Sequence, residues 1–270
     1  MPEAEQGMNV ARIGLLLAGL PQSVAGVTVN RFCASGLQAV ADAAARIRTG
    51  EADIMIGSGT ESMSAMPQIM GNKVSMNPAI FAHEENIGMA FGMGLTGEKV
   101  AERWKVSRED QDAFALKSNQ KAVAAIQNGH LKDGIVPITV KENYIKDGKI
   151  ATREYIVDTD EGPRADTSLE ALGKLKPVFA ANGSVTAGNS SQTSDGAAFV
   201  LVMSEAKVKE LGVKPIAKLV SFAVAGVPPR IMGIGPIYAI PKALKQAGLQ
   251  KEDIDLFELN EAFASQSLAV

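Results

Sequence analysis

The chain has 270 residues, of which 46% are hydrophobic, so it can bury the core of one large domain or of two ordinary ones. Only 5% of the residues are aromatic while alanine and glycine are plentiful, which favours close helix–sheet packing in an α/β protein over an aromatic-rich β-sandwich. A net charge of −3 argues against a protein that binds nucleic acid or a membrane surface, because such proteins are usually basic.

Two features bear on the compartment. A single cysteine cannot form an internal disulfide, which favours a reducing environment. Residues 12–20 are as apolar as the core of a signal peptide, but residues 1–7 are acidic where a signal peptide is positively charged. No stretch approaches the length that spans a bilayer. We therefore interpret residues 12–20 as a short core helix and expect a soluble, cytoplasmic protein.

The first 64 residues alternate between expected helices and strands. Residues 25–29 form a short apolar run that is typical of a buried strand. Apolar residues then recur at helical spacing from Leu37 to Ile47, and Thr49 and Gly50 end this run. Residues 53–57 predict the next strand. This order is typical of βαβ units and predicts a parallel sheet.

The middle of the chain is less regular. Residues 63–93 mix Met, Asn and Pro without a sustained period, and we expect them to run over the surface. One helix is predicted over residues 96–104, and a longer one runs from its cap at Ser107 to a stop at Gly129. Residues 135–140 predict a strand, and the polar residues 141–150, with Asp-Gly at positions 147–148, predict a hairpin connection.

Core-like patterning returns in the last third of the chain. It covers residues 197–203 and 215–225, and residues 236–248 predict a helix with a proline inside it. Residues 255–259 predict a strand that leads into Asn260. The chain ends inside an apparent helix without a cap, so we expect the sequence to be a fragment of a longer protein.

Cys33 is the first candidate for chemistry, because it stands where the apolar run of residues 25–29 gives way to a predicted helix. The free N–H groups and the dipole at the start of a helix favour a thiolate and lower a cysteine pKa from about 8.5. Residues 34–36 are small and leave room for a bulky substrate near the sulfur. The competing interpretation is a buried cysteine that acts as a small hydrophobic residue.

The other candidate motifs give weaker evidence of a function. Residues 92–97 fit the G-x-G-x-x-G pattern of dinucleotide-binding turns, but no buried strand precedes them, so we do not assign that function. His83 and His130 lack the partner spacing of a catalytic base. One cysteine and two scattered histidines also lack the spacing of metal ligands, so we expect no metal.

Three further turns rich in small residues border predicted strands. They cover residues 186–191, 226–236 and 260–264. Together with the turn at Cys33, they suggest a backbone that closely surrounds a long, narrow ligand. An asparagine that follows a buried strand, such as Asn260, can orient a hydrogen bond toward an oxyanion.

Four segments in this order resemble signature motifs of the thiolase family. They are the nucleophile turn (residues 30–36), the coenzyme A loop (186–197) and two further signatures (232–236 and 260–264). The resemblance spans essentially the whole chain. It implies an α/β fold of five αβαβα layers, with two similar halves and an inserted loop domain, and assembly as a homodimer or homotetramer.

The resemblance also implies a division of the chain. Residues 1–64 and 187–211 would form an N-terminal core that is incomplete at its start, and residues 65–186 would form the loop domain. Residues 212–270 would begin a truncated C-terminal half. The family's Gly-His-Pro motif, which carries its general base, and the turn with its second cysteine are both absent from the chain. We therefore expect these 270 residues to be inactive alone.

Roles of single residues follow from the same resemblance. Cys33 would accept the acyl group, and Asn260 would hold a water that helps to form an oxyanion hole. Coenzyme A would be a co-substrate and not a permanent cofactor. The residues expected to bind it are Met93, Phe179, Ala187, Ser191 and Met232 along the pantetheine tunnel, and Arg164 at the nucleotide end.

The implied activity is that of an acetyl-CoA C-acyltransferase, which cleaves 3-ketoacyl-CoA in fatty-acid β-oxidation. The Cys33 thiolate would attack the 3-keto carbon, acetyl-CoA would leave, and free coenzyme A would take the acyl group from the sulfur. Gly92 stands where acetoacetyl-forming thiolases carry a histidine, which favours the degradative enzymes. Two alternatives remain, a condensing acetyl-CoA C-acetyltransferase and a non-catalytic acyl-CoA-binding protein.

Overall fold

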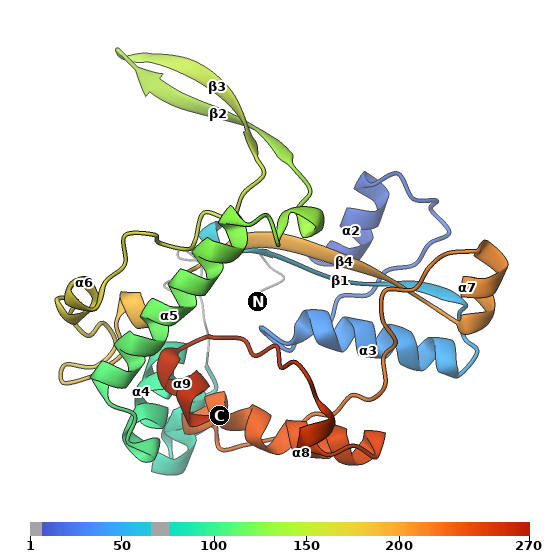
Figure 1. Ribbon diagram of the computed structural model, residues 1–270. Helices are drawn as coiled ribbons and strands as arrows, with labels where there is room; N and C mark the ends of the chain where they lie inside the picture. Colours follow the sequence, from blue (N-terminus) through green and yellow to red (C-terminus); the bar gives the residue numbers. More distant parts are fainter. Residues whose placement is uncertain (1–6, 66–75) are drawn as a thin grey trace. The chain divides into compact units, whose positions relative to one another are not determined.

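The computed structural model describes residues 7–65 and 76–270 (Figure 1). Residues 66–75 of the predicted surface segment, and most of the acidic residues 1–7, lie outside the described residues. The chain divides into two compact units. The first comprises Met1–Asn86, Thr193–Gly226 and Gly235–Phe257. The second comprises Ile87–Gln192, Val227–Ile234 and Glu258–Val270.

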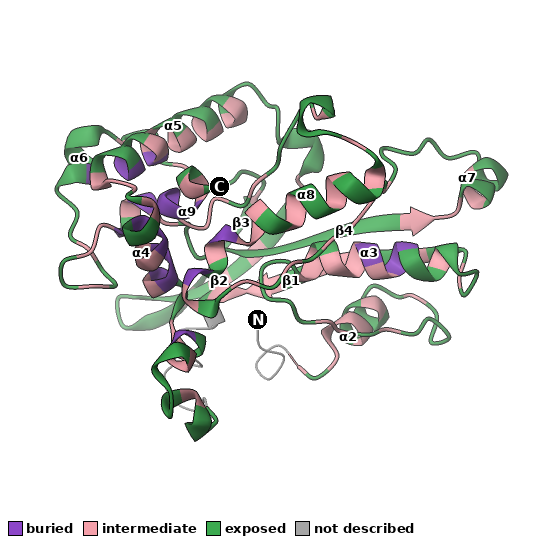
Figure 2. Cartoon of the chain, turned by 90° about the horizontal axis from the view of Figure 1, so that it is seen from below, coloured by how far each residue is buried: buried purple, intermediate pink, exposed green. Residues whose placement is uncertain are grey.

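The first unit is built on a pair of antiparallel strands with a helix against it. β1 (Ile54–Ser62) pairs with β4 (Asp195–Met203), from Ile54 opposite Met203 to Ser62 opposite Asp195. α3 (Ser35–Arg48) packs on β1 and carries the buried residues Ala41, Ala43 and Ala44 (Figure 2). The predicted parallel pairing is therefore wrong for β1. The order of elements along the chain indicated local βαβ units, but the partner of β1 comes from a segment more than a hundred residues later.

α3 lies close to β1 at two glycines that share one face of the strand. A Cβ added to Gly57 would lie 2.8 Å from Val40 Cγ2 and 2.9 Å from Val40 Cα. A Cβ added to Gly59 would lie 3.7 Å from Gly36 Cα, which is an ordinary contact. The helix therefore leaves no space for a side chain at Gly57 but leaves space for one at Gly59.

This difference yields a prediction about stability. Gly57→Ala should lower the free energy of unfolding by about 1–3 kcal/mol, because the new methyl group overpacks against the backbone of α3. Gly59→Ala is the matched control on the same strand and should stay within about 0.5 kcal/mol. Urea unfolding followed by far-UV circular dichroism measures both, and equal stability of the two variants would contradict this packing.

Three apolar segments adopt no strand structure: residues 25–29 and 255–259, which were predicted as strands, and residues 215–225, whose pattern was only core-like. Residues 25–29 instead lie against α2 (Val10–Leu17), where Asn9 Nδ2 donates to the carbonyl of Gly26 at 3.0 Å. Residues 215–225 are held by side chains, with Arg48 donating to the carbonyl of Leu219 at 2.8 Å. Residues 255–259 are also irregular. An apolar run becomes a strand only where a neighbouring strand accepts its backbone hydrogen bonds, and these segments have none among the described residues.

The helices of the first unit follow the sequence pattern more closely. α2 confirms the helix predicted near residues 12–20, but it buries no residue and Leu17 is 83% exposed, so the expectation of a core helix is wrong. The apolar side chains of α2 find no second layer of described residues to cover them. α8 (Gly235–Ala247) includes the predicted internal proline. α7 (Glu205–Leu211) completes the α-helices among the described residues of this unit.

The second unit is mainly helical and carries one long hairpin. Its α-helices are α4 (Met93–Trp104), α5 (Arg108–Gln127), α6 (Leu169–Gly173) and α9 (Ala264–Ala269). The Ser107 hydroxyl accepts a hydrogen bond from the backbone N–H of Asp110 at 3.0 Å, which confirms the predicted cap of α5. The largest buried side chains of the unit include Val100, Gln111, Val185, Thr186, Ile234 and Ser265.

The hairpin consists of β2 (Ile138–Lys146) and β3 (Lys149–Val157), which extend away from the helices of their unit (Figure 1). Asp147 and Gly148 form the turn with positive φ angles of 52° and 74°, as the Asp-Gly pair predicts. The polar residues around this turn belong to the strands and not to a loop. The predicted strand over residues 135–140 overlaps β2 only at its end, and most residues on both faces of the hairpin are exposed.

Short 3-10 helices connect these elements. They are η1 (Met63–Ala65), η2 (Pro78–Phe81), η3 (Glu84–Ala90), η4 (Lys132–Gly134), η5 (Ala187–Asn189), η6 (Pro229–Ile234) and η7 (Lys251–Asp253). Two of them, η5 and η6, carry candidate site residues.

Candidate active site

Cys33 is exposed and lies directly before Ala34, the N-cap residue of α3. Side chains of the turn hold its backbone. The N–H of Phe32 donates to Asn30 Oδ1 at 2.9 Å, and the N–H of Arg31 donates to Ser35 Oγ at 2.7 Å. Ser35 Oγ in turn donates to the carbonyl of Phe32 at 2.6 Å. The sulfur is therefore carried by a turn of fixed shape at the start of a helix.

The residue before the sulfur is strained. Phe32 has a φ angle of 47°, in the left-handed region that bulky residues avoid. Such a conformation costs on the order of 1–3 kcal/mol and persists where the surrounding structure imposes it, most often at functional sites. Here the backbone N–H of Phe32 donates to Asn30 and its carbonyl accepts from Ser35. The sequence carries no signal for this strain, because glycine or asparagine is the usual residue at positive φ.

The other predicted site residues all lie in the second unit. Each of them is exposed. These residues are Met93, Arg164, Phe179, Ala187, Ser191, Met232 and Asn260. Cys33 belongs to the first unit.

The segment that carries Asn260 pairs with the segment that carries Ser191. The N–H of Ser191 donates to the carbonyl of Ala262 at 2.9 Å, and Ser190 forms a β-bridge with Phe263. Ser118 of α5 donates a hydrogen bond to Glu261. The structure therefore brings two motifs, some seventy residues apart in the chain, onto the same helices of the second unit.

α4 contacts these motifs through glycines. The Phe179 ring occupies the space of a side chain at Gly94, and a Cβ at Gly97 would lie 3.0 Å from the Phe263 ring. The two rings meet edge to face, with centroids 6.2 Å apart and an interplanar angle of 88°. The G-x-G-x-x-G pattern thus serves helix packing, and a 3-10 helix precedes it in place of a strand.

Met232 and Arg164 occupy different settings. Met232 lies in η6 beside the buried Ile231, and a Cβ at the next residue, Gly233, would lie 2.8 Å from Gln266 Cγ of α9. Arg164 lies on an exposed loop, where its N–H donates to Asn119 Oδ1 at 2.9 Å. Its guanidinium donates to Asp166 at 3.2 Å, and this hydrogen bond and the positive charge hold the pKa of the Asp166 carboxyl below its ordinary value.

No sequence pattern indicated the residues of α4 and α5 that hydrogen-bond to these segments. Glu98 of α4 accepts the backbone N–H groups of Ser184 and Val185, each at 2.9 Å. Asp112 of α5 accepts a hydrogen bond from Asn189 at 3.0 Å. Their partners lie 86, 87 and 77 residues away in sequence, so no local pattern connects them. Within the described ranges, no group of three or more His, Cys, Asp or Glu side chains could hold a metal ion.

Comparison with known proteins gives the family. Residues 1–206 match the N-terminal domain of thiolases, and residues 213–270 match their C-terminal domain. The chain is 52% identical over its full length to the 3-ketoacyl-CoA thiolase of Bacillus subtilis, and it covers 68% of that relative. It is 49% identical to peroxisomal 3-ketoacyl-CoA thiolase B of Rattus norvegicus over 97% of the chain and 61% of that relative. The chain belongs to the thiolase family.

A solved structure agrees with this assignment. The dimeric peroxisomal thiolase of Saccharomyces cerevisiae superimposes with a TM-score of 0.85 at 41% identity, over 95% of this chain and 63% of that one. The predicted resemblance and the predicted α/β fold of the thiolase type are thereby confirmed. The chain thus spans roughly two thirds of the length of these relatives. Among the helices of residues 7–65 and 76–270, none is long and apolar enough to cross a membrane.

Proposed function

We propose that the chain carries the nucleophile and part of the coenzyme A site of a degradative 3-ketoacyl-CoA thiolase. The observation that carries this proposal is Cys33, an exposed thiol on a strained turn at the start of a helix. It stands in a chain that is 52% identical throughout to a relative named 3-ketoacyl-CoA thiolase. The peroxisomal relatives of the same name add support.

The reaction proceeds by two transfers of the acyl group. The Cys33 thiolate attacks C3 of the 3-ketoacyl-CoA, and the bond between C2 and C3 breaks. The two carbons leave as the enolate of acetyl-CoA, which is protonated, and the shortened acyl group stays on the sulfur as a thioester. The thiol of free coenzyme A then attacks this thioester and loses its proton, and the Cys33 thiolate leaves.

The remaining site residues take the roles that their chemistry allows. Asn260 holds a water that donates to the oxyanion. The apolar side chains Met93, Phe179 and Met232, with Ala187 and Ser191, contact the pantetheine arm, and the exposed Arg164 meets the phosphates at the nucleotide end. Residues 65–186 are the loop domain, between N-terminal core segments at residues 1–64 and 187–211, and residues 212–270 begin the C-terminal half.

The proposal also covers the cofactor, the compartment, the oligomeric state and the direction of the reaction. The enzyme binds no permanent cofactor, acts in the cytoplasm and assembles as a homodimer or homotetramer, in line with the dimeric yeast thiolase. The degradative direction is favoured over condensation because Gly92 stands where a histidine would mark an acetoacetyl-forming enzyme.

Turnover on two substrates tests the proposal. The protein encoded by the complete open reading frame is incubated with coenzyme A and either a long-chain 3-ketoacyl-CoA or acetoacetyl-CoA. We expect acetyl-CoA and an acyl-CoA that is two carbons shorter, with a higher kcat/KM on the long chain. A preference for acetoacetyl-CoA would support the acetyltransferase, and binding without any product would support an acyl-CoA-binding protein.

A further inference from the structure

The loop of residues 184–191 is exposed where it is expected to meet coenzyme A and buried where it is anchored. Ala187 and Ser191 are exposed, whereas Thr186 and Asn189 are buried. The loop closes on itself, because the N–H of Thr186 donates to Asn189 Oδ1 at 2.8 Å and Ser190 Oγ donates to the carbonyl of Thr186 at 2.7 Å. These bonds set its internal shape, but they do not fix its place in the unit.

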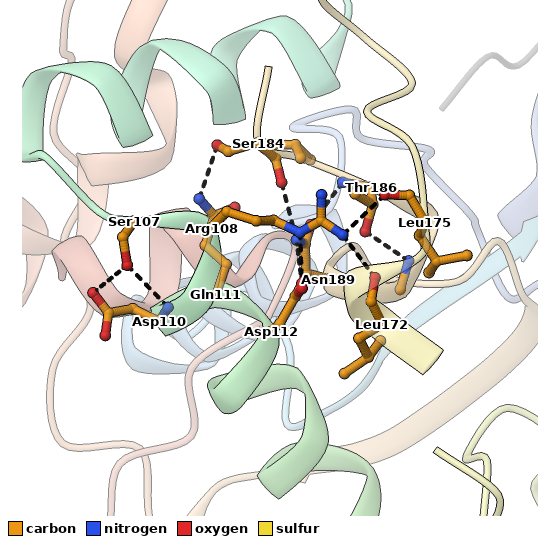
Figure 3. A network of polar contacts seen from close by, with 12 residues as sticks. Ser107, Arg108, Asp110, Gln111, Asp112, Leu172, Leu175, Ser184, Thr186 and Asn189 are labelled. Carbon is orange, nitrogen blue, oxygen red and sulfur yellow. Dashed lines mark hydrogen bonds and ion pairs between the residues drawn. The ribbon is translucent and has the colours of Figure 1, made fainter. Parts of the chain in front are cut away.

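A buried contact with α5 fixes that place. Asn189 is 3% exposed, and its Nδ2 donates to Asp112 Oδ1 at 3.0 Å and to the carbonyl of Ser184 at 3.1 Å (Figure 3). Asp112 is 5% exposed, and its other oxygen accepts from Arg108 Nε at 2.8 Å. Both oxygens of the carboxylate are thus in use. Because a buried polar group without a partner is costly, this pairing specifies one arrangement of the loop on the helix.

Arg108 extends the anchor to the neighbouring helix. Its guanidinium donates to the carbonyls of Leu172 at 2.7 Å and Leu175 at 3.0 Å (Figure 3). The side chains of these two leucines occupy the space that a Cβ at Gly188 would take. The loop is therefore fixed at Asn189 by a hydrogen bond to Asp112. At Gly188 it is fixed by apolar contact with the two leucines whose carbonyls Arg108 binds.

A second anchor holds the beginning of the loop. The Glu98 carboxylate of α4 accepts the N–H groups of Ser184 and Val185, and Gln111 Nε2 donates to Ser184 Oγ at 2.9 Å. Glu98 and Ser184 are half-buried, whereas Asp112 and Asn189 are both buried. The exposed residues of the loop thus lie on a scaffold provided by α4 and α5.

We infer that Asp112 is a positioning residue, which acts through Asn189 to hold the 184–191 loop in the conformation that binds coenzyme A. The inference rests on the proposed function and deepens it by naming what sets the affinity of the coenzyme A site. Asp112 itself is buried under the loop and touches no substrate in this role. Its loss should weaken coenzyme A binding and leave the thiol of Cys33 as reactive as before.

Asp112→Asn is the test substitution. Asparagine keeps the shape of the side chain, but its amide nitrogen must face either Arg108 Nε or Asn189 Nδ2, both of which are donors. In the protein encoded by the complete open reading frame, we expect the KM for coenzyme A to rise roughly tenfold or more, as for the loss of a charge-assisted hydrogen bond, with kcat changed by no more than about threefold.

Alkylation of Cys33 by iodoacetamide gives a readout that does not depend on turnover. Without coenzyme A, the rate should be the same in the parent and in Asp112→Asn. Added coenzyme A should protect Cys33, and the half-protecting concentration should rise in the variant by the same factor as the KM. Ser107→Ala is the matched control, because it removes the cap of the same helix, α5, without touching the loop.

Two further variants guard against a trivial loss of folding. Asp112→Asn combined with Asn189→Asp exchanges donor and acceptor, so the amide introduced on α5 can donate to the carboxylate introduced on the loop, and the KM should recover in part. Glu98→Gln leaves the buried pair intact and removes one acceptor. This lost acceptor belongs to the second anchor, the one at Ser184 and Val185, so Glu98→Gln should raise the KM and the half-protecting concentration together, by a smaller factor than Asp112→Asn.

The outcomes distinguish a failure of the positioning role of Asp112 from a failure of the proposed thiolase function. Unchanged KM and protection in Asp112→Asn and Glu98→Gln, or the same change in Ser107→Ala, would overturn the positioning role. Slower alkylation of Cys33 in step with the KM change would show a general structural defect and would also overturn it. If the parent neither turns over nor gains protection from coenzyme A, the proposed function itself fails, and the positioning role fails with it.

Discussion

Cys33→Ser should reduce thiolysis of 3-ketoacyl-CoA by at least about a thousandfold, because a serine hydroxyl is far weaker as a nucleophile than a thiolate at neutral pH. The substitution changes one atom on an exposed turn, so the protein should fold as before. Steady-state rates of the protein encoded by the complete open reading frame measure the effect. Far-UV circular dichroism and the Kd for coenzyme A serve as controls for folding and binding.

The size of the loss separates two roles of Cys33. If the thiol only packs as a small side chain, serine or alanine at this position should change turnover by a few fold. If the sulfur carries the acyl group, both variants should lose turnover together while still binding coenzyme A. A Cys33→Ser protein that works within tenfold of the parent would contradict the proposed mechanism.

Asn260→Ala should lower kcat by about a hundredfold and leave the KM nearly unchanged, because a donor to a developing oxyanion acts mainly in the transition state. Asn260 is exposed and lies two residues before Ala262, whose carbonyl accepts the N–H of Ser191. Asp255→Asn, an exposed change in the same segment, should leave both constants within about twofold. Steady-state kinetics on the long-chain substrate measure all three proteins.

The opposite pattern would remove Asn260 from the chemistry. A higher KM with an unchanged kcat would mean that Asn260 contributes equally to binding the substrate and the transition state. A similar loss in Asp255→Asn would indicate a general effect of this segment on folding.

Local signals predicted the longer helices and one turn correctly, whereas the short helices α6 and α7 were not predicted. The cap at Ser107, the helix after Cys33 and the Asp-Gly turn of the β2–β3 hairpin each depend on residues that are close together in sequence. Their backbone hydrogen bonds are made within a few residues, so composition and spacing suffice to predict them.

Strand pairing did not follow from the sequence, because it depends on residues far apart. β1 finds its partner in β4, with Ile54 opposite Met203, and no feature of residues 53–57 indicates that segment or its direction. The apolar residues 25–29, 215–225 and 255–259 resemble strands in composition, but no described strand pairs with them. Hydrophobicity identified segments that can be buried, but it did not identify the segments with which they pair.

The candidate site shows the same division. The candidate residues of the thiolase motifs could be proposed from sequence because they cluster in short segments. Phe32, Glu98 and Asp112 were not found, since their importance lies in a backbone angle and in contacts that span 77 to 87 residues. Such supporting residues become visible only when the helices that carry them are packed under the loop.

Detection of an acyl group on the Cys33 sulfur tests most directly whether this residue is the nucleophile. The protein encoded by the complete open reading frame is mixed with a 3-ketoacyl-CoA without free coenzyme A, quenched in acid, digested and analysed by mass spectrometry. We predict that the peptide containing Cys33 gains the mass of the shortened acyl group and loses it again when coenzyme A is added before the quench. Formation of the shortened acyl-CoA while Cys33 stays unmodified, or an acyl group found on a different residue, would contradict the account.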